Sequence, residues 1–164
     1  MRLAIFAWGN PSRGDDAAGP WLAQRLRSRC SDEITLVEDF QLQVEHLLDC
    51  RGASLLLFVD ARCDEPGEFR FEEVIAQRSL AHTSHALTPG ELLGYYSRTF
   101  VGEAPAPAFQ LTVPGQHFDL GEPMSETTLL CCQRALEFLC SIIARPQPQH
   151  WRTLIRPKAT GSAC

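Results

Sequence analysis

Two short, unbroken apolar runs that end in turn residues are the strongest constraint on the fold of this chain. Leu3–Trp8 is followed by Gly-Asn-Pro, and Ser54–Asp60 reads Ser-Leu-Leu-Leu-Phe-Val-Asp. Apolar runs without polar alternation are typical of strands that are covered on both faces, as in parallel sheets. We therefore predict that both runs are buried strands of a parallel sheet.

The remaining patterns place helices between further strands. Strands are predicted at 34–37, near 69–73 and at 108–113, the second of these close to a sheet edge. Helices are predicted from a start between residues 16 and 20, over 44–50, from a capping box at Thr88 and Glu91 to about 98, and from Ser125 to about 144. This order predicts a three-layer α/β protein with a mainly parallel sheet and helices on both faces.

Length and composition fit a single domain. The chain has 164 residues, of which 45% are hydrophobic and 21% charged, as in ordinary globular domains. We predict one α/β domain over residues 1–144. Residues 145–164 lose the helical pattern and are rich in proline and polar residues, so we predict a poorly ordered tail there.

Charge, hydropathy and cysteine usage exclude several classes of protein. The net charge is −5 with no basic stripe, which argues against a nucleic-acid partner. No segment approaches the ~20 apolar residues of a membrane helix, so no membrane partner is expected. The seven cysteines form no Cys-x-x-Cys pair and are odd in number, which argues against a disulfide scaffold or a thiolate zinc site. We expect a cytoplasmic protein.

Candidate chemical residues cluster near the carboxyl ends of the predicted strands. Asp15 and Asp16 follow the first strand, Asp60 ends the third, and His82 and His85 precede the third helix. The carboxyl ends of parallel strands meet at one edge of the sheet, where ligands bind. Carboxylates and imidazoles suit a borderline divalent metal such as nickel or zinc. The sequence therefore predicts a metal site at this edge.

Each of these residues also has a purely structural interpretation. Asp15 or Asp16 could cap the first helix, where a carboxylate accepts hydrogen bonds from free amides. Asp60 could be a turn residue that closes its strand. Spacing alone does not choose between His82 and His85. The convergence of three loops on one edge favours the metal site, because capping and turn roles do not require it.

The first turn resembles that of a known family. Residues 3–20, Leu-Ala-Ile-Phe-Ala-Trp-Gly-Asn-Pro-Ser-Arg-Gly-Asp-Asp-Ala-Ala-Gly-Pro, resemble the opening of the nickel-iron hydrogenase maturation peptidases. In that family a strand leads to Gly-Asn, a short loop, an acidic pair and a glycine. Residues 58–61 (Phe-Val-Asp-Ala) are similar to its second acidic position, and residues 83–87 (Thr-Ser-His-Ala-Leu) to its histidine segment. The resemblance covers roughly residues 1–143.

The resemblance implies a fold, an activity and a site. The fold would be a twisted five-stranded sheet between helices. The activity would be that of an endopeptidase that removes the carboxyl-terminal extension of a hydrogenase large-subunit precursor after nickel insertion. Asp16, Asp60 and His85 would be its metal-contacting and catalytic residues, which favours His85 over His82. Nickel would be supplied by the precursor rather than bound permanently.

Residues 38–46 depart from the pattern of many family members. They read Glu-Asp-Phe-Gln-Leu-Gln-Val-Glu-His, where many members carry a segment like Asp-Gly-Gly-Thr. This version resembles the branch that serves cytoplasmic NAD-reducing hydrogenases. Asp39 and Gln41 are candidates for recognition of the precursor, although Asp39 fits a turn residue at the end of a strand equally well.

Two other functions are compatible with the sequence. One is a maturation chaperone that binds the precursor without cutting it. The other is a small-ligand or nucleotide-binding α/β domain whose acidic turn holds magnesium. Against the latter, no Gly-x-Gly-x-x-Gly follows the first strand, and Asp15 stands where a phosphate loop carries lysine. The sequence favours the peptidase.

Overall fold

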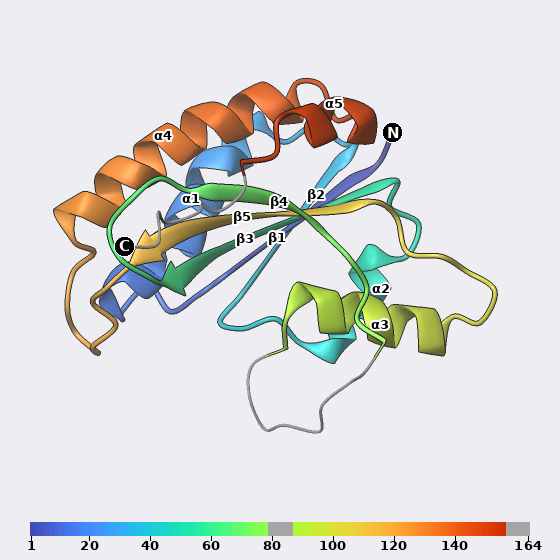
Figure 1. Cartoon of the computed structure of the whole chain (residues 1–164), viewed down its shortest axis with the longest axis horizontal. Helices are drawn as coiled ribbons and strands as arrows, with labels where there is room; N and C mark the ends of the chain where they lie inside the picture. Colours follow the sequence, from blue (N-terminus) through green and yellow to red (C-terminus); the bar gives the residue numbers. More distant parts are fainter. Residues whose placement is uncertain (79–86, 157–164) are drawn as a thin grey trace, which may run out of the picture.

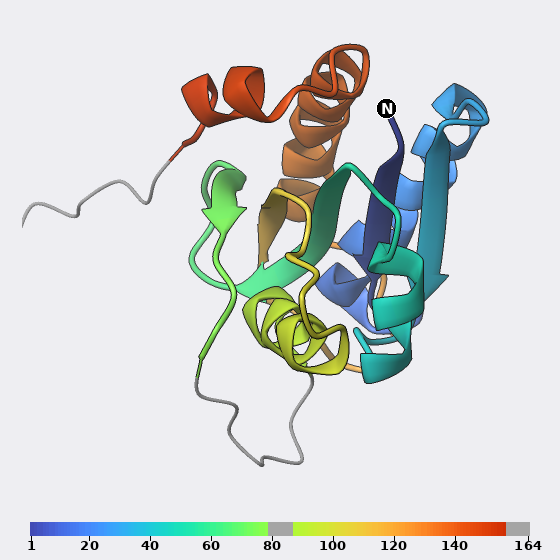
Figure 2. The same cartoon turned by 90° about the vertical axis from the view of Figure 1, so that its right-hand side faces the viewer.

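A mainly parallel five-stranded sheet forms the middle layer of the protein. The computed structural model describes residues 1–78 and 87–156. Its strands are β1 (Leu3–Trp8), β2 (Ile34–Asp39), β3 (Leu55–Cys63), β4 (Arg70–Val74) and β5 (Ala108–Gly115), in the spatial order β2-β1-β3-β5-β4. All neighbouring pairs are parallel except β4 with β5. Figure 2 shows β2 and β4 at opposite edges of the sheet. The predicted α/β class and sheet are confirmed.

Helices cover both faces of the sheet (Figure 1). On one face lie α1 (Ala18–Leu26), α4 (Glu126–Ile143) and α5 (Pro148–Thr153), and on the other lie α2 (Leu47–Cys50) and α3 (Pro89–Thr99). Three 3-10 turns, η1 (Gly14–Ala17), η2 (Arg27–Arg29) and η3 (Val44–His46), adjoin α1 and α2. The result is the three-layer arrangement that the alternation of elements predicts.

The two apolar runs form the centre of the sheet because both faces of their strands are covered. Every residue of β1 and residues 55–59 of β3 are buried. Alternate side chains enter different cores: Leu3 and Ile5 pack towards α1 and α4, whereas Ala4 and Phe6 pack towards α2 and α3. A strand between two apolar cores needs no polar face, which explains the uninterrupted pattern.

The helix starts that the sequence predicts are also present. Thr88 Oγ1 accepts a hydrogen bond from the Glu91 amide at 3.3 Å, and the Glu91 carboxylate accepts one from the Thr88 amide at 2.9 Å. Ser125 Oγ accepts from the Thr128 amide at the start of α4. These side chains satisfy amides that the first turn of a helix leaves without a partner. Both predicted helix starts are confirmed.

Residues 145–156 differ from the sequence-based expectation of a poorly ordered tail. They contain α5, whose Trp151 is completely buried and donates its indole N–H to the Ile142 and Arg145 carbonyls at 3.1 Å each. The Arg156 amide then bonds to the Phe71 carbonyl on β4. One large aromatic side chain therefore holds a segment that has no helical periodicity. Residues 157–164 lie outside the described part.

Two further expectations concern membranes and disulfides. None of the helices in the described ranges is both long and apolar enough to span a bilayer. The six cysteines at positions 30, 50, 63, 131, 132 and 140 are all free thiols. Burial raises the pKa of Cys50 and Cys132 to about 12, so these two thiols stay protonated and pack as small apolar side chains.

Candidate functional site

The candidate site lies where the winding of the sheet reverses. The chain places β2 on one side of β1 and then returns to place β3 on the other side. In open α/β sheets, ligands bind at such a point, outside the carboxyl ends of the strands. Asp16 lies in η1, which follows β1, and Asp60 lies in β3, so the two residues come from the two sides of this reversal point. Both line a cavity of about 440 Å³. The structure therefore brings together two of the three predicted site residues.

The histidine of the predicted site cannot be placed in the same way. His85, like its competitor His82, belongs to residues 79–86, which lie outside the described residues. Within residues 1–78 and 87–156, no three His, Cys, Asp or Glu side chains are arranged to hold a metal ion. The metal-contacting roles of Asp16, Asp60 and His85 therefore stay predictions.

Asp60 reaches the cavity because its strand continues further than its neighbour. The pairing of β1 with β3 ends at Ala7 and Val59, whereas β5 pairs with β3 as far as Cys63. Asp60 is thus the first residue of β3 beyond its pairing with β1, and it lies inside the strand. Its interpretation as a turn residue that closes the strand is wrong.

The environment of Asp60 disfavours its ionised form. Burial and, to a lesser extent, the nearby charge of Asp16 raise the pKa of Asp60 to about 7, although hydrogen bonds from the Ala61 amide and the Trp8 side chain oppose the shift. The Ala61 amide lies 2.8 Å from Asp60 Oδ1. A carboxyl group with a strongly raised pKa in a cavity is typical of functional sites.

Asp16 is held by the turn that precedes it. Its Oδ2 accepts a hydrogen bond from the Asn10 amide at 2.8 Å, and within the described residues its Oδ1 accepts none. Neither η1 nor α1 has a side-chain cap. The interpretation of Asp16 as a helix cap is therefore wrong, and one carboxylate oxygen is left for a ligand.

Asp15 supports the site rather than forming it. Its side chain is completely buried, and its carboxylate accepts hydrogen bonds from the amides of Gln116, His117 and Ser125 at 2.8, 3.0 and 2.8 Å. Burial acts to raise the pKa of Asp15, but these amides outweigh it and hold the pKa below its ordinary value. Asp15 thus anchors the loop between β5 and α4 and does not cap the first helix.

Gly14 lets the first turn approach that loop. Its φ is +53°, and a Cβ at this position would lie 2.3 Å from the His117 carbonyl oxygen. The Gly14 amide donates to the Glu122 carbonyl at 3.0 Å, and the Asp15 amide to the His117 carbonyl at 2.7 Å. Only glycine tolerates both this backbone conformation and this contact. The turn that carries Asp16 is therefore fixed to the β5–α4 loop.

The cavity wall contains residues that the sequence did not single out. Besides Asp16, Asp60 and the predicted Gln41, it is lined by Trp8, Asn10, Arg13, Phe40 and Ala61. Most of them follow the carboxyl ends of β1 and β2, so the rule that located the carboxylates could also have found them. Amide and guanidinium donors thus share the cavity with the two carboxylates.

The carboxylate of Asp39 is engaged by its own loop. It accepts hydrogen bonds from the Phe40 amide at 2.6 Å and the Gln43 side chain at 3.2 Å, and it lies 3.4 Å from His46 Nε2. Its role in precursor recognition stays a prediction, as does that of Gln41.

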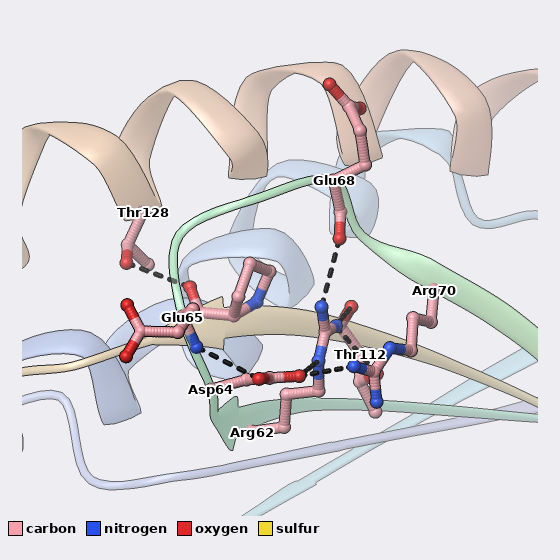
Figure 3. A network of polar contacts seen from close by, with 8 residues as sticks. Arg62, Asp64, Glu65, Glu68, Arg70, Thr112 and Thr128 are labelled. Atoms are coloured by element: carbon pink, nitrogen blue, oxygen red, sulfur yellow. Dashed lines mark hydrogen bonds and ion pairs between the residues drawn. The ribbon is translucent and has the colours of Figure 1, made fainter. Parts of the chain in front are cut away.

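An arginine-centred network fixes the end of β3 beyond Asp60 (Figure 3). The Arg62 guanidinium donates to the Thr112 carbonyl at 2.6 Å and to the Glu68 carbonyl at 3.0 Å. Arg62 also pairs with Asp64 at 3.1 Å, and Asp64 pairs with Arg70 on β4. The network joins β3, β4 and β5 just past the cavity. Strand β3 is therefore held by its pairing with β1 before Asp60 and by this network after Asp60.

The fold is that of solved hydrogenase maturation proteases. No family model and no curated protein sequence matches the chain. Among solved structures, it is similar to the nickel-iron hydrogenase maturation protease HycI from Thermococcus kodakarensis, with a TM-score of 0.69, 22% identity, and coverage of 88% of this chain and 93% of that one. For the hydrogenase maturating endopeptidase HybD from Escherichia coli these values are 0.70, 17%, 89% and 94%. At such identities the likeness establishes the fold.

We expect Asp60→Asn to stabilise the folded protein by about 1–2 kcal/mol, because it removes a charge from a partly buried site. The folded-state pKa of Asp60 is about 7, against an ordinary value of 3.8. As pH rises between these values, the unfolded chain loses this proton first, so the wild type loses stability that the variant keeps. Urea unfolding across this pH range should show the advantage of the variant growing with pH. An advantage that is absent or independent of pH would contradict the raised pKa.

Proposed function

We propose that the protein is an endopeptidase that removes the carboxyl-terminal extension of a nickel-iron hydrogenase large-subunit precursor after nickel insertion. The observation that carries this proposal is the cavity that Asp16 and Asp60 share at the reversal point of the sheet. The fold shared with the maturation proteases HycI and HybD supports it. The cytoplasm is the proposed compartment.

In the proposed mechanism, nickel arrives as part of the substrate. Nickel bound to the precursor would contact Asp16 and Asp60, together with His85 as the family resemblance implies. Metal ions polarise carbonyl groups and activate water, which contributes several kcal/mol in metal-dependent hydrolases. A carboxylate that acts as general base adds a factor of ~10²–10⁴. Contact with the metal would also restrict cleavage to precursors that have been loaded.

We further propose that residues 38–46 select the precursor and place the protein in the branch that serves NAD-reducing hydrogenases. Phe40 and Gln41 line the same cavity as the two carboxylates, which supports this role. Phe40 is 65% exposed, so its ring is open to contact with a bound peptide. A precursor bound in the cavity would meet this segment.

The nickel requirement is tested by comparing nickel-loaded and nickel-free precursor in the same cleavage assay. We expect loss of the carboxyl-terminal peptide from the loaded precursor alone. Equal cleavage of both forms would contradict recognition of the metal. Binding of the loaded precursor without cleavage would instead identify a chaperone, and thermal stabilisation by nucleotide and magnesium without precursor binding would identify a nucleotide-binding domain.

A further inference from the structure

Among the described residues that line the cavity of Asp16 and Asp60, Arg13 is the single cationic side chain. The side chain is exposed, and its Nε donates a hydrogen bond to the Phe118 carbonyl at 3.1 Å. This bond orients the guanidinium. Within the described residues it leaves both terminal nitrogens without a hydrogen-bond acceptor.

Hydrogen bonds also hold the backbone of Arg13 in place. Its amide donates to the Asn10 carbonyl at 3.0 Å, and its carbonyl accepts from the Asp16 amide at 3.1 Å. Gly14 follows directly and is bound to the β5–α4 loop. Arg13 therefore lies on a rigid turn, so the binding of a ligand to it costs little conformational entropy of the protein.

Several arginines of the described chain have carboxylate partners that Arg13 lacks. Six of them form ion pairs with carboxylates: Arg27, Arg51, Arg62, Arg70, Arg134 and Arg152. Within the same part of the chain Arg13 forms none, although two carboxylates line its cavity. Its charge is therefore not used in a structural ion pair.

We propose that Arg13 binds the precursor through a main-chain carbonyl oxygen beside the bond that is cleaved. The inference rests on the proposed function. A peptide in this cavity brings carbonyl oxygens that need donors, and ionised carboxylates have none to offer. A guanidinium is the strongest donor among the lining side chains because its hydrogen bonds are charge-assisted. Arg13 thus binds the peptide, while Asp16 and Asp60 contact the metal and take part in the reaction.

The test compares steady-state cleavage of nickel-loaded precursor by the wild type, Arg13→Gln and Arg13→Lys. Loss of one charge-assisted hydrogen bond should raise KM about tenfold or more and leave kcat nearly unchanged, since the interaction is equally strong before and during the reaction. Lysine should rescue only part of the loss, because one ammonium group replaces the forked guanidinium. Arg29→Gln removes the same charge from an exposed residue outside the cavity wall and should leave KM unchanged.

A second measurement is independent of activity. Phenylglyoxal modifies accessible arginines, and peptide mass spectrometry locates the products. We expect excess nickel-loaded precursor to protect Arg13 and not Arg29. Suppose that the wild type cleaves normally. An unchanged KM in Arg13→Gln, or the absence of protection of Arg13, would then overturn this inference and leave the proposed function standing. Absence of cleavage by the wild type would overturn the proposed function and this inference with it.

Discussion

Asp16→Asn should reduce cleavage of the nickel-loaded precursor by roughly 10²–10⁴-fold while leaving the fold intact. The asparagine carbonyl can still accept the hydrogen bond that the Asn10 amide donates to Asp16 Oδ2 at 2.8 Å. The turn is therefore kept, and what is lost is the negative charge and the second carboxylate oxygen of a residue that lines the cavity. Initial rates followed by intact mass measure the effect, and circular dichroism checks the fold.

The matched control for Asp16 is Asp32→Asn. Asp32 is an exposed aspartate in the turn before β2, and it does not line the cavity. This variant removes the same charge and should cleave at the wild-type rate. A fully active Asp16→Asn variant would contradict the assignment of Asp16 to the site and would leave the acidic turn with a structural role only.

Asp15→Ala should destabilise the protein by about 3–5 kcal/mol, a large share of the 5–15 kcal/mol that a typical domain has. The substitution leaves three partly buried amides of the β5–α4 loop without their acceptor. That loop holds Gly14 and Arg13, so the geometry of the cavity should suffer as well. Asp119→Ala, an exposed aspartate in the same loop, should change stability by less than about 0.5 kcal/mol. Urea unfolding of both variants checks this, and equal losses would contradict the anchoring role.

The contribution of Asp15 should also depend on pH, with the opposite sign to that of Asp60. Its folded-state pKa lies below the ordinary value of 3.8, so its stabilising effect is complete above that value. The effect is lost as pH falls from 3.8 towards the folded-state pKa, because the unfolded chain takes up this proton before the folded protein does. The difference in stability between the wild type and Asp15→Asn should therefore shrink on acidification. A difference that stays constant would contradict the lowered pKa.

The sheet could be predicted from the sequence because its signals are local. The runs that became β1 and β3 are apolar throughout, and the caps at Thr88 and Ser125 use side chains within three residues of the amides they bind. Helix α5 could not be predicted, because a single buried Trp151, and not a periodic pattern, holds it in place. The sequence predicts that β3 ends at Asp60, whereas the strand continues to Cys63. Its last residues pair with β5, which lies about fifty residues away in the chain, so no local pattern indicates them.

The site was predictable in position and only partly in detail. The rule that ligands bind beyond the carboxyl ends of parallel strands located Asp16 and Asp60. It did not separate Asp15 from Asp16, because their difference depends on the β5–α4 loop, whose amides surround only Asp15. Arg13 had no signal of its own, since its role depends on the distant Phe118 carbonyl and on a cavity formed by three strands.

The central claim is that the protein cuts a hydrogenase large-subunit precursor near its carboxyl end. The most direct test incubates the purified protein with its nickel-loaded precursor and records the intact mass of both products. We predict a single cut that releases one carboxyl-terminal peptide, and the same cut at least ~10²-fold more slowly by Asp16→Asn under the same conditions. A precursor that keeps its full mass, although it binds the wild-type protein, would contradict the peptidase assignment.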